Sequence, residues 1–375
     1  MFVTYINTIT TCIKVIVLAH TLNGEHMGIV IGSGSLQFEF QSGWQQRPAG
    51  WPLEDIAAVC TDSGGNVYLY GRGEHPVSVY DSSGRFVRSW GERRFSNRSH
   101  GMFMTPDDEL YLVDDGMNFV GRFTLDGELV QMIGPGGIRS DSGYRDHDSR
   151  TIVRAAGPYN SPTNVTVARS GDLYVSDGYR NASVHHFAPD GRLIRTWGGP
   201  GSGPGQFRTP HGVATTADGR VFVADRENDR VQIFTPDGRF LEEWTDIQRP
   251  QDIFVDQDGL IYVAELSRFE GEESVRLGSI DEYLPARMSI FNADGELLLR
   301  WSDPDSTKDG YFTSVHGIWV DGEGSLYVAE VTEIWAVEHG HATVQDHRLQ
   351  KFTRVRSTAP LDAGSPDNSE AVISS

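Results

Sequence analysis

Three histidines recur at one position of a repeated sequence pattern. His100, His211 and His316 are each followed by glycine and an apolar residue, and each stands eleven positions before an aromatic residue. A single buried histidine is usually a hydrogen-bonded packing residue, but three at a matched position favour a shared ligand. Three imidazoles with one open position are typical of catalytic zinc. We therefore predict that these histidines bind Zn²⁺, with another divalent cation as the alternative.

The same alignment assigns polar residues to the copies that lie between the histidines. Asp55, Asn164 and Asp252 occupy this position in the first, third and fifth copies, so that histidine alternates with Asp or Asn along the chain. Metal-bound histidines commonly donate their second ring N–H to such side chains. We predict that these three residues line the central channel or support the metal ligands.

The elements that position these residues are six copies of a strand-rich unit. The copies begin near Asp55, His100, Asn164, His211, Asp252 and His316. Each copy has short segments of alternating apolar residues separated by Asp-Gly or similar turns, which is typical of antiparallel hairpins. Six such four-stranded units predict an all-β fold, a six-bladed β-propeller. Alternate blades of the ring then direct the three imidazoles toward one point on its axis.

The last copy lacks an outer strand, and the sequence before the first copy supplies a candidate. Residues 35–44 alternate Leu36, Phe38 and Phe40 with polar residues. Pairing of this N-terminal strand into the last blade would close the ring and remove an open edge. We predict one propeller domain over residues 28–355, an N-terminal extension over 1–27, and a disordered tail over 356–375, which is rich in Ser, Pro, Asp and Ala. The long insertion at 134–159 is expected at the rim of the propeller or as a lid.

Several segments resemble a known family. SDGYRNASVHHF (Ser176 to Phe187), PGQFRTPHGVA, VADRENDRVQIF (Val223 to Phe234) and GRGEH around Arg72 are similar to the NHL-repeat propeller of peptidyl-α-hydroxyglycine α-amidating lyase. The resemblance covers residues 50 to 353. It implies a zinc-dependent carbon–nitrogen lyase that cleaves a C-terminal α-hydroxyglycine into an amide and glyoxylate. Its zinc ligands match the three histidines already identified.

The resemblance also implies roles for three further residues. The catalytic tyrosine of the family matches Tyr179, and its two substrate arginines match Arg226 and Arg72. The reaction requires the carbinolamide hydroxyl to lose a proton while the C–N bond breaks, and zinc assists as a Lewis acid. Tyr179 would take this proton and return it to the amide nitrogen. The planar guanidinium groups suit a bidentate grip on the substrate carboxylate.

The departures from the family leave other functions open. Gly317 stands where animal members carry an aspartate that helps to hold a structural Ca²⁺, so the resemblance leaves calcium undecided. One alternative is a different metal-dependent lyase or hydrolase for a small carboxylated substrate. Another is a non-catalytic NHL-repeat scaffold that binds a partner.

Composition narrows the partners and the compartment. A formal charge of −20 and a pI near 4.9 argue against nucleic acid and against anionic membranes as partners. We expect a monomer that acts on a small molecule or a peptide C-terminus. Two cysteines give no disulfide framework, and the first residues lack the basic region of a signal peptide. These features favour a cytoplasmic location.

Overall fold

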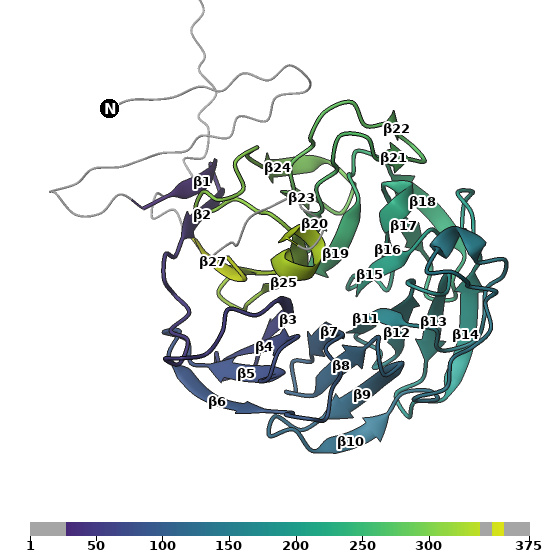
Figure 1. Cartoon of the computed structure of the whole chain (residues 1–375), viewed down its shortest axis with the longest axis horizontal. Helices are drawn as coiled ribbons and strands as arrows, with labels where there is room; N and C mark the ends of the chain where they lie inside the picture. The colour runs from purple at the N-terminus through teal and green to yellow at the C-terminus, as the bar shows by residue number, and fades with distance from the viewer. Residues whose placement is uncertain (1–27, 338–346, 356–375) are drawn as a thin grey trace, which may run out of the picture.

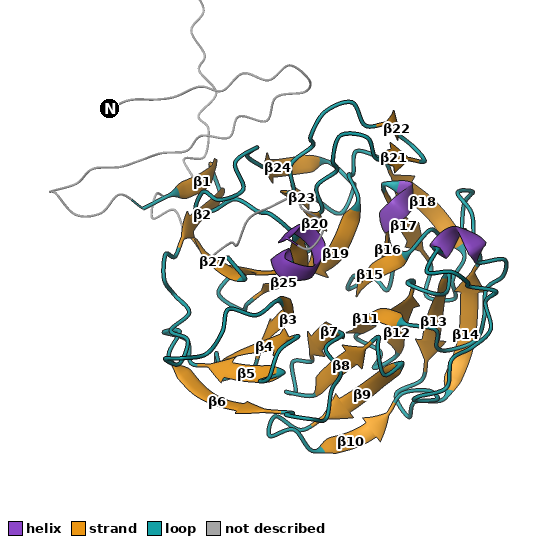
Figure 2. Ribbon diagram, viewed as in Figure 1, coloured by secondary structure: helices purple, strands orange, loops and turns teal. Residues whose placement is uncertain are grey.

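The computed structural model, which describes residues 28–337 and 347–355, contains six antiparallel sheets arranged around a central axis (Figure 1). The predicted all-β, six-bladed propeller is confirmed. The predicted extension at 1–27 and tail at 356–375 lie outside the described residues. The helical turns among the described residues are short: η1 (Ser149–Thr151), η2 (Arg226–Asn228) and η3 (Glu333–Val337), coloured purple in Figure 2.

Each blade places its first strand next to the axis and its fourth at the outer edge. Blades one to three contain β3 (Ile56–Thr61), β4 (Val67–Gly71), β5 (Val77–Tyr80), β6 (Phe86–Trp90); β7 (Ser99–Met104), β8 (Leu110–Asp114), β9 (Phe119–Phe123), β10 (Leu129–Met132); and β11 (Pro162–Val167), β12 (Leu173–Asp177), β13 (Ser183–Phe187), β14 (Leu193–Gly198).

Blades four and five contain β15 (Pro210–Thr215), β16 (Val221–Asp225), β17 (Arg230–Phe234), β18 (Phe240–Trp244); and β19 (Pro250–Val255), β20 (Ile261–Glu265), β23 (Arg287–Phe291), β24 (Leu297–Trp301). A small hairpin of β21 (Glu273–Ser274) and β22 (Gly278–Ser279) is inserted in blade five. Blade six contains β25 (Val315–Val320), β26 (Leu326–Glu330) and β27 (Leu349–Arg354), followed in space by two strands from the N-terminal side, β2 (Leu36–Phe40) and β1 (Val30–Ser33).

The N-terminal strand closes the ring as predicted. Strand β2 pairs antiparallel with β27, where Phe38 opposes Arg354 and Phe40 opposes Phe352. Phe38 is fully buried, and its ring stacks on Trp301 with centroids 6.4 Å apart. Strand β1 adds a fifth strand outside β2, which the sequence pattern did not predict. The two ends of the described chain are therefore held together by backbone pairing and by a shared apolar core.

A buried acidic residue at the end of the second strand anchors five of the six blades. Its carboxylate accepts hydrogen bonds from backbone N–H groups of the segment that leads into the innermost strand of the same blade. Glu330, for example, accepts from the N–H groups of Thr313 and Ser314 at 2.9 and 3.0 Å. These anchors fix where each innermost strand begins, and the candidate site lies at these beginnings. The five residues are Asp114, Asp177, Asp225, Glu265 and Glu330.

The insertion at 134–159 lies against the turn that follows β12. The Ser142 hydroxyl donates to the carbonyl of Arg180, and Asn181 donates to the carbonyl of Ala156 at 3.2 Å. Arg139 donates to the Ser161 hydroxyl at 2.7 Å. The segment therefore forms part of the rim beside Tyr179.

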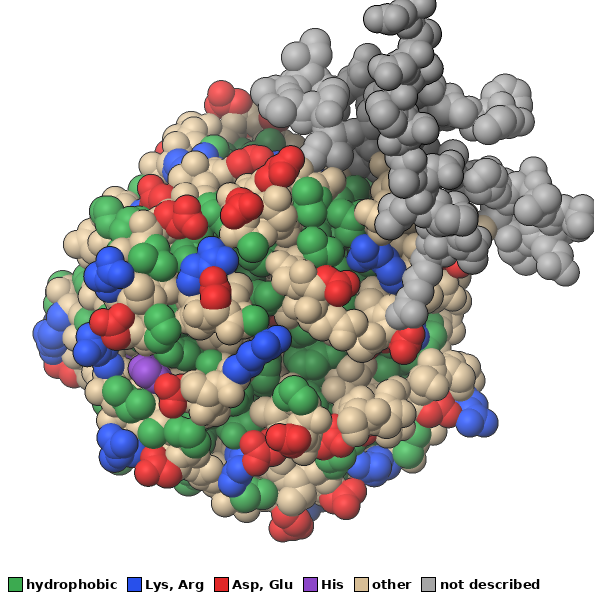
Figure 3. Space-filling view, turned by 180° about the vertical axis from the view of Figure 1, so that it is seen from behind, with side chains coloured by type: hydrophobic (Ala, Val, Ile, Leu, Met, Phe, Trp, Pro, Cys, Tyr) green, Lys and Arg blue, Asp and Glu red, His purple; other side chains and the backbone are tan. Residues whose placement is uncertain are grey.

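The face of the ring that points away from the viewer in Figure 1 has charged and apolar side chains mixed over its surface. Figure 3 shows acidic and basic side chains interspersed there with apolar ones, without a large region of one sign. Within the part of the chain that the structure describes, no helix has the length and apolar character needed to cross a membrane.

Candidate metal centre

The structure brings the three predicted histidines together at the start of alternate innermost strands. His100, His211 and His316 come from β7, β15 and β25, and their rings have centroids 4.6 to 5.2 Å apart. Each side chain offers a nitrogen within 4.8 Å of the other two, and the residues are between 1% and 5% exposed. Among the described residues, this cluster is the group of three or more His, Cys, Asp or Glu side chains that could hold a metal ion.

Each imidazole is oriented by a backbone carbonyl of the next blade. The ring nitrogen Nδ1 faces this carbonyl oxygen, which only accepts hydrogen bonds, so Nδ1 must carry the proton. The Nε2 atom of every ring is then left with a free electron pair that points toward the channel axis. The pairs are His100 with Thr163, His211 with Gln251 at 2.7 Å, and His316 with Ala57 at 2.7 Å.

The predicted phase of the intervening polar residues is wrong. Each histidine is the second residue of its innermost strand, β7, β15 or β25. The second residues of β3, β11 and β19 are the ones whose carbonyls the histidines use, so these residues are the equivalents of the histidines. Asp55 thus stands two positions too early, and Asn164 and Asp252 stand one position too late. The same β-bulge occurs at the start of all six innermost strands, so the mismatch lies in the alignment of the copies: the spacing of eleven residues to the next aromatic residue was not applied to Tyr68, Tyr174 and Tyr262. The true equivalents are Ala57, Thr163 and Gln251.

These acidic and amide side chains do not support the histidines by accepting from their rings. Asp55 accepts from the backbone N–H groups of Glu333 and Ile334 in the last blade. Asn164 donates across the channel to Asp252 at 2.7 Å, and Asp252 also accepts from the N–H of Ile318 at 3.0 Å. Asn164 and Asp252 line a channel cavity of about 10 Å³ together with the three histidines. Such a cavity is about the size of one water molecule.

The glycine that follows each histidine is required by the neighbouring blade. A Cβ atom at Gly101, Gly212 or Gly317 would lie 2.9, 2.9 or 2.6 Å from the same carbonyl oxygen that the preceding histidine uses. These distances are shorter than a carbon–oxygen contact allows. The His-Gly pair therefore lets the next innermost strand approach closely enough to hold the ring.

Burial keeps the three imidazoles neutral. Removal from water lowers the pKa of each histidine well below its ordinary value, and the nearby positive charge of Arg72 acts in the same direction on all three. Neutral rings with protonated Nδ1 atoms offer three Nε2 electron pairs. The Nε2 of His316 has no hydrogen-bond partner among the described residues.

The donor set fits a cation. The hydroxyl oxygen of Tyr179 lies 2.9 Å from Nε2 of His100 and 3.1 Å from Nε2 of His211. A single hydroxyl proton satisfies one of these nitrogens, which leaves two buried electron pairs unsatisfied. A buried polar atom without a partner costs about 1–3 kcal/mol. A metal ion would satisfy all three nitrogens at once, and the nitrogen-only set suits zinc better than magnesium or calcium.

The structure also brings the predicted substrate residues to this end of the channel. Tyr179 follows β12, Arg72 follows β4 and Arg226 follows β16, which are equivalent points of blades three, one and four. The Arg226 guanidinium carbon lies 5.4 Å from the centre of the Tyr179 ring, and its Nη1 donates to the side chain of Gln251 at 3.3 Å. Arg72 donates from Nε to the carbonyl of Ser99 at 3.1 Å. We call this end of the channel, with Tyr179 and the two arginines around the histidines, the channel mouth.

Sequence analysis missed a third arginine at the channel mouth. Arg98 immediately precedes β7, and its guanidinium carbon lies 5.5 Å from the centre of the Tyr179 ring. It makes a bidentate ion pair with the buried carboxylate of Asp115, with both N–O distances at 2.9 Å. The available signal was its place two residues before a predicted ligand.

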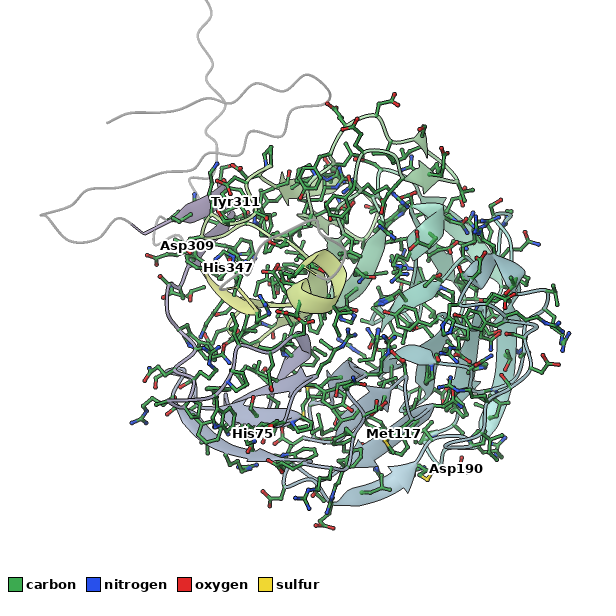
Figure 4. The ribbon with its side chains drawn as sticks, in the orientation of Figure 1. His75, Met117, Asp190, Asp309, Tyr311 and His347 are labelled. Carbon is green, nitrogen blue, oxygen red and sulfur yellow. The ribbon has the colours of Figure 1, made fainter. Side chains whose placement is uncertain are left out.

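The remaining described histidines lie outside this cluster. Figure 4 labels His75 and His347, both of which lie away from the centre of the ring. His185 is buried against Asp177 at 3.1 Å, and His186 pairs with Asp172 at 3.0 Å. His147 is exposed on the insertion. His339 and His341 fall outside the described residues.

Comparisons with known proteins find two groups of similar proteins. A family model described as NHL repeat matches residues 207–234. NHL repeat-containing protein 3 of Homo sapiens is 26% identical over 265 residues, which cover 65% of this chain and 72% of that protein. Peptidyl-alpha-hydroxyglycine alpha-amidating lyase 1 of Drosophila melanogaster is 28% identical over 181 residues, which cover 45% of this chain and 31% of that protein. The match therefore spans about a third of the length of that lyase.

Solved structures show the fold alone. A gluconolactonase from Xanthomonas campestris superposes with a TM-score of 0.54 at 14% identity, and the match covers 85% of this chain and 90% of the other.

The resemblance to the α-amidating lyases is confirmed by the sequence comparisons. The chain thus carries an NHL repeat within a six-bladed propeller and is related in sequence to peptidyl-α-hydroxyglycine α-amidating lyases.

Proposed function

We propose that this protein is a zinc-dependent carbon–nitrogen lyase that cleaves an α-hydroxyglycine-type carbinolamide into an amide and glyoxylate. The observation that carries the proposal is the meeting of three neutral, buried Nε2 atoms, two of them within hydrogen-bond distance of the Tyr179 oxygen, beside Arg72 and Arg226. The similarity to proteins named as α-amidating lyases supports the same reaction. The substrate is a small molecule or the C-terminus of a peptide, and the protein acts as a monomer.

His100, His211 and His316 would hold the metal. When bound, zinc supplies Lewis-acid stabilisation to the negative charge that develops on the substrate hydroxyl oxygen. Arg72 and Arg226 orient the substrate by binding its carboxylate, since a guanidinium group matches a carboxylate in geometry and charge. Their positions on blades one and four place this positive charge beside the histidines, in a protein whose overall charge is −20.

Tyr179 moves the proton. Its oxygen already lies within hydrogen-bond distance of two ligand nitrogens, so a hydroxyl group held at the metal would be within its reach. In one relay, the Tyr179 hydroxyl gives its proton to the departing amide nitrogen and receives the O–H proton of the substrate, while the C–N bond breaks and the carbonyl of glyoxylate forms. The products are the amide and glyoxylate, and no net proton is gained or lost.

The test combines metal analysis with an assay of glyoxylate release from α-hydroxyhippurate. The purified full chain is expected to hold about one zinc ion and to release glyoxylate, because the cluster offers one three-nitrogen site. Tyr179→Phe should keep the metal and lower kcat by at least about 100-fold, the usual scale of general acid–base catalysis. His316→Ala should lose the metal, whereas His147→Ala, an exposed histidine of the insertion, should behave as the wild type.

Two outcomes would overturn the proposal in different ways. Bound zinc without glyoxylate release would retain a metalloprotein but remove the lyase, and would favour another metal-dependent reaction on a carboxylated substrate. A protein that binds no divalent metal at this site would instead favour a non-catalytic NHL-repeat scaffold. Full activity in Tyr179→Phe would show that another group moves the proton.

A further inference from the structure

A group of arginines extends from the channel mouth along the rim between blades two and three. Arg98 lies at the channel mouth, Arg180 directly follows Tyr179, and Arg139 lies on the insertion that borders them. Partial burial lowers the pKa of Arg139, the positive charges of Arg180 and Arg98 act in the same direction, and the carboxylates of Asp115 and Asp177 act against them. We call Arg98, Arg139 and Arg180 the rim arginines.

Two of the rim arginines lack a carboxylate partner. In the part of the chain that the structure describes, neither Arg139 nor Arg180 has an Asp or Glu oxygen within 4.0 Å. Arg139 instead donates to the Ser161 hydroxyl and to the carbonyl of Gly116, and Arg180 lies 5.3 Å from the centre of the Tyr144 ring. Neighbouring like charges repel one another, and this protein has 52 acidic residues available. The carboxylates of Asp115 and Asp177 offset part of this repulsion, and an anion bound between the guanidinium groups would offset more of it.

Arg98 is held in a fixed orientation toward the site. Asp115 binds its Nε and Nη2 atoms, while the side chain of Arg98 remains 40% exposed and that of Asp115 is 4% exposed. The Nη1 group takes no part in this ion pair and is available to a ligand. A guanidinium group held this way loses little conformational entropy when it binds an anion.

The position of Tyr179 indicates the side on which the acyl end would leave. Arg98 and Arg226 reach the Tyr179 ring from blades two and four, which flank blade three. In the proposed function, Arg226 and Arg72 bind the carboxylate of the hydroxyglycine end, and Arg72 lies beside Arg98 because it donates to the carbonyl of Ser99. Tyr179 of blade three protonates the amide nitrogen in that function, so the acyl group bonded to this nitrogen would extend along blade three toward the rim arginines.

We propose that the rim arginines form a second anion subsite that binds a carboxylate on the acyl side of the substrate. This inference rests on the proposed lyase function and names its substrate class as an N-acyl-α-hydroxyglycine with an acidic acyl group. A small dicarboxylic acyl group and the side chain of a C-terminal glutamyl residue offer the same chemistry. The reaction that supplies the substrate must then hydroxylate the glycine carbon of an acidic N-acylglycine.

The kinetic test compares substrates that have a negatively charged acyl group with substrates of the same shape that have an uncharged acyl group. N-succinyl-α-hydroxyglycine is paired with its succinamoyl analogue, and acetyl-Glu-α-hydroxyglycine is paired with acetyl-Gln-α-hydroxyglycine. The wild type is expected to prefer the charged member by at least about 10-fold in kcat/KM at low salt, and less at high salt because screening weakens the attraction. A larger preference within the succinyl pair would indicate a small dicarboxylic acyl group. A larger preference within the Glu/Gln pair would indicate a peptide.

Arg98→Met should reduce this preference toward one, and the ratio within each pair cancels any general loss of activity. Arg150→Met is the matched control, because Arg150 lies on the same insertion, is 78% exposed and is paired with Asp148. The control should retain the wild-type ratio. A wild-type ratio near one, or an unchanged ratio in Arg98→Met with metal retained, would overturn the inference.

A binding measurement separates this inference from the lyase itself. Calorimetry compares succinamate with succinamide, the amide products expected from the first substrate pair. Tighter binding of succinamate that is lost in Arg98→Met would support the anion subsite even if no glyoxylate is released. Equal binding of the two amides would remove the subsite, while glyoxylate release from α-hydroxyhippurate would leave the lyase standing.

Discussion

At the scale of single residues, the histidines depend on atoms that sequence patterns cannot display. Repetition was sufficient to predict that the three histidines meet, since their spacing to the following aromatic residue is constant. The groups that hold them are main-chain carbonyls of Ala57, Thr163 and Gln251. A carbonyl is present at every position, so its use leaves no residue preference in the sequence. The predicted polar supports were therefore sought among side chains and were misplaced.

Asp252 gives a pH prediction at the same scale. Burial raises its pKa from 3.8 to about 7, because loss of water outweighs the hydrogen bonds from Ile318, Ile253 and Asn164. Between these two pH values the folded protein holds a proton that the unfolded chain has released. The free energy of unfolding should therefore fall as pH rises from about 4 to about 7 and then level off, by up to about 4 kcal/mol for this group.

The measurement is urea unfolding of the metal-free wild type and of Asp252→Asn at pH 5 and pH 8. Asparagine cannot ionise, so the stability of the wild type relative to the variant should be greater at pH 5 than at pH 8. A difference that stays constant between the two pH values would show that Asp252 keeps an ordinary pKa in the folded protein.

At the scale of elements, the distance between adjacent innermost strands decides whether the site exists. Glycine at three His-Gly steps permits β7, β15 and β25 to approach their neighbours. The strand pattern and the Asp-Gly turns were visible in the sequence, and so was the closing strand at Leu36–Phe40. The bulges that set the register were not, because they depend on how a strand pairs with its partner rather than on its own residues.

Gly212→Ala tests this contact. The new methyl group would lie 2.9 Å from the Gln251 carbonyl and 2.8 Å from the Asp252 Cα, so β15 and β19 must separate. We expect a loss of about 1–3 kcal/mol in the free energy of unfolding, the usual cost of overpacking. Zinc affinity should fall as well, because the separation moves the carbonyl that orients His211.

Gly322→Ala is the control for this prediction. A Cβ at Gly322 would have no heavy atom within 4 Å, and the residue lies in a turn of blade six. Urea unfolding and zinc titration of the two variants provide the comparison. Equal effects in both would mean that the tight approach between β15 and β19 has no special importance.

At the scale of the whole molecule, the ring is held shut where β2 meets β27. Phe38 makes several contacts at this closure. It is fully buried, its ring stacks on Trp301, and the ring centre lies 5.1 Å from the guanidinium carbon of Arg354. The overall architecture was predictable because six similar units leave few alternatives. The arginine-rich rim was not, because it joins blade two, blade three and the insertion, which are separate in the sequence pattern.

Phe38→Ala tests the closure. Removal of a fully buried phenylalanine should lower the free energy of unfolding by about 3–5 kcal/mol. Val87→Ala on the outer strand β6 is the control, because Val87 is 49% exposed and should cost no more than about 0.5 kcal/mol. Urea unfolding measures both. A small effect in Phe38→Ala would indicate that the other five blades stabilise the fold without the closing strand.

The bond between His316 and the carbonyl of Ala57 joins residues 259 positions apart, across the seam of the ring. The last ligand thus receives its orientation from the first blade to leave the ribosome. A growing chain can present His100 and His211 early, but it cannot complete the trio until the sixth blade has docked on the first. In the proposed metal centre, loading would therefore come late, after the sixth blade has docked, and a loaded centre would report a closed ring.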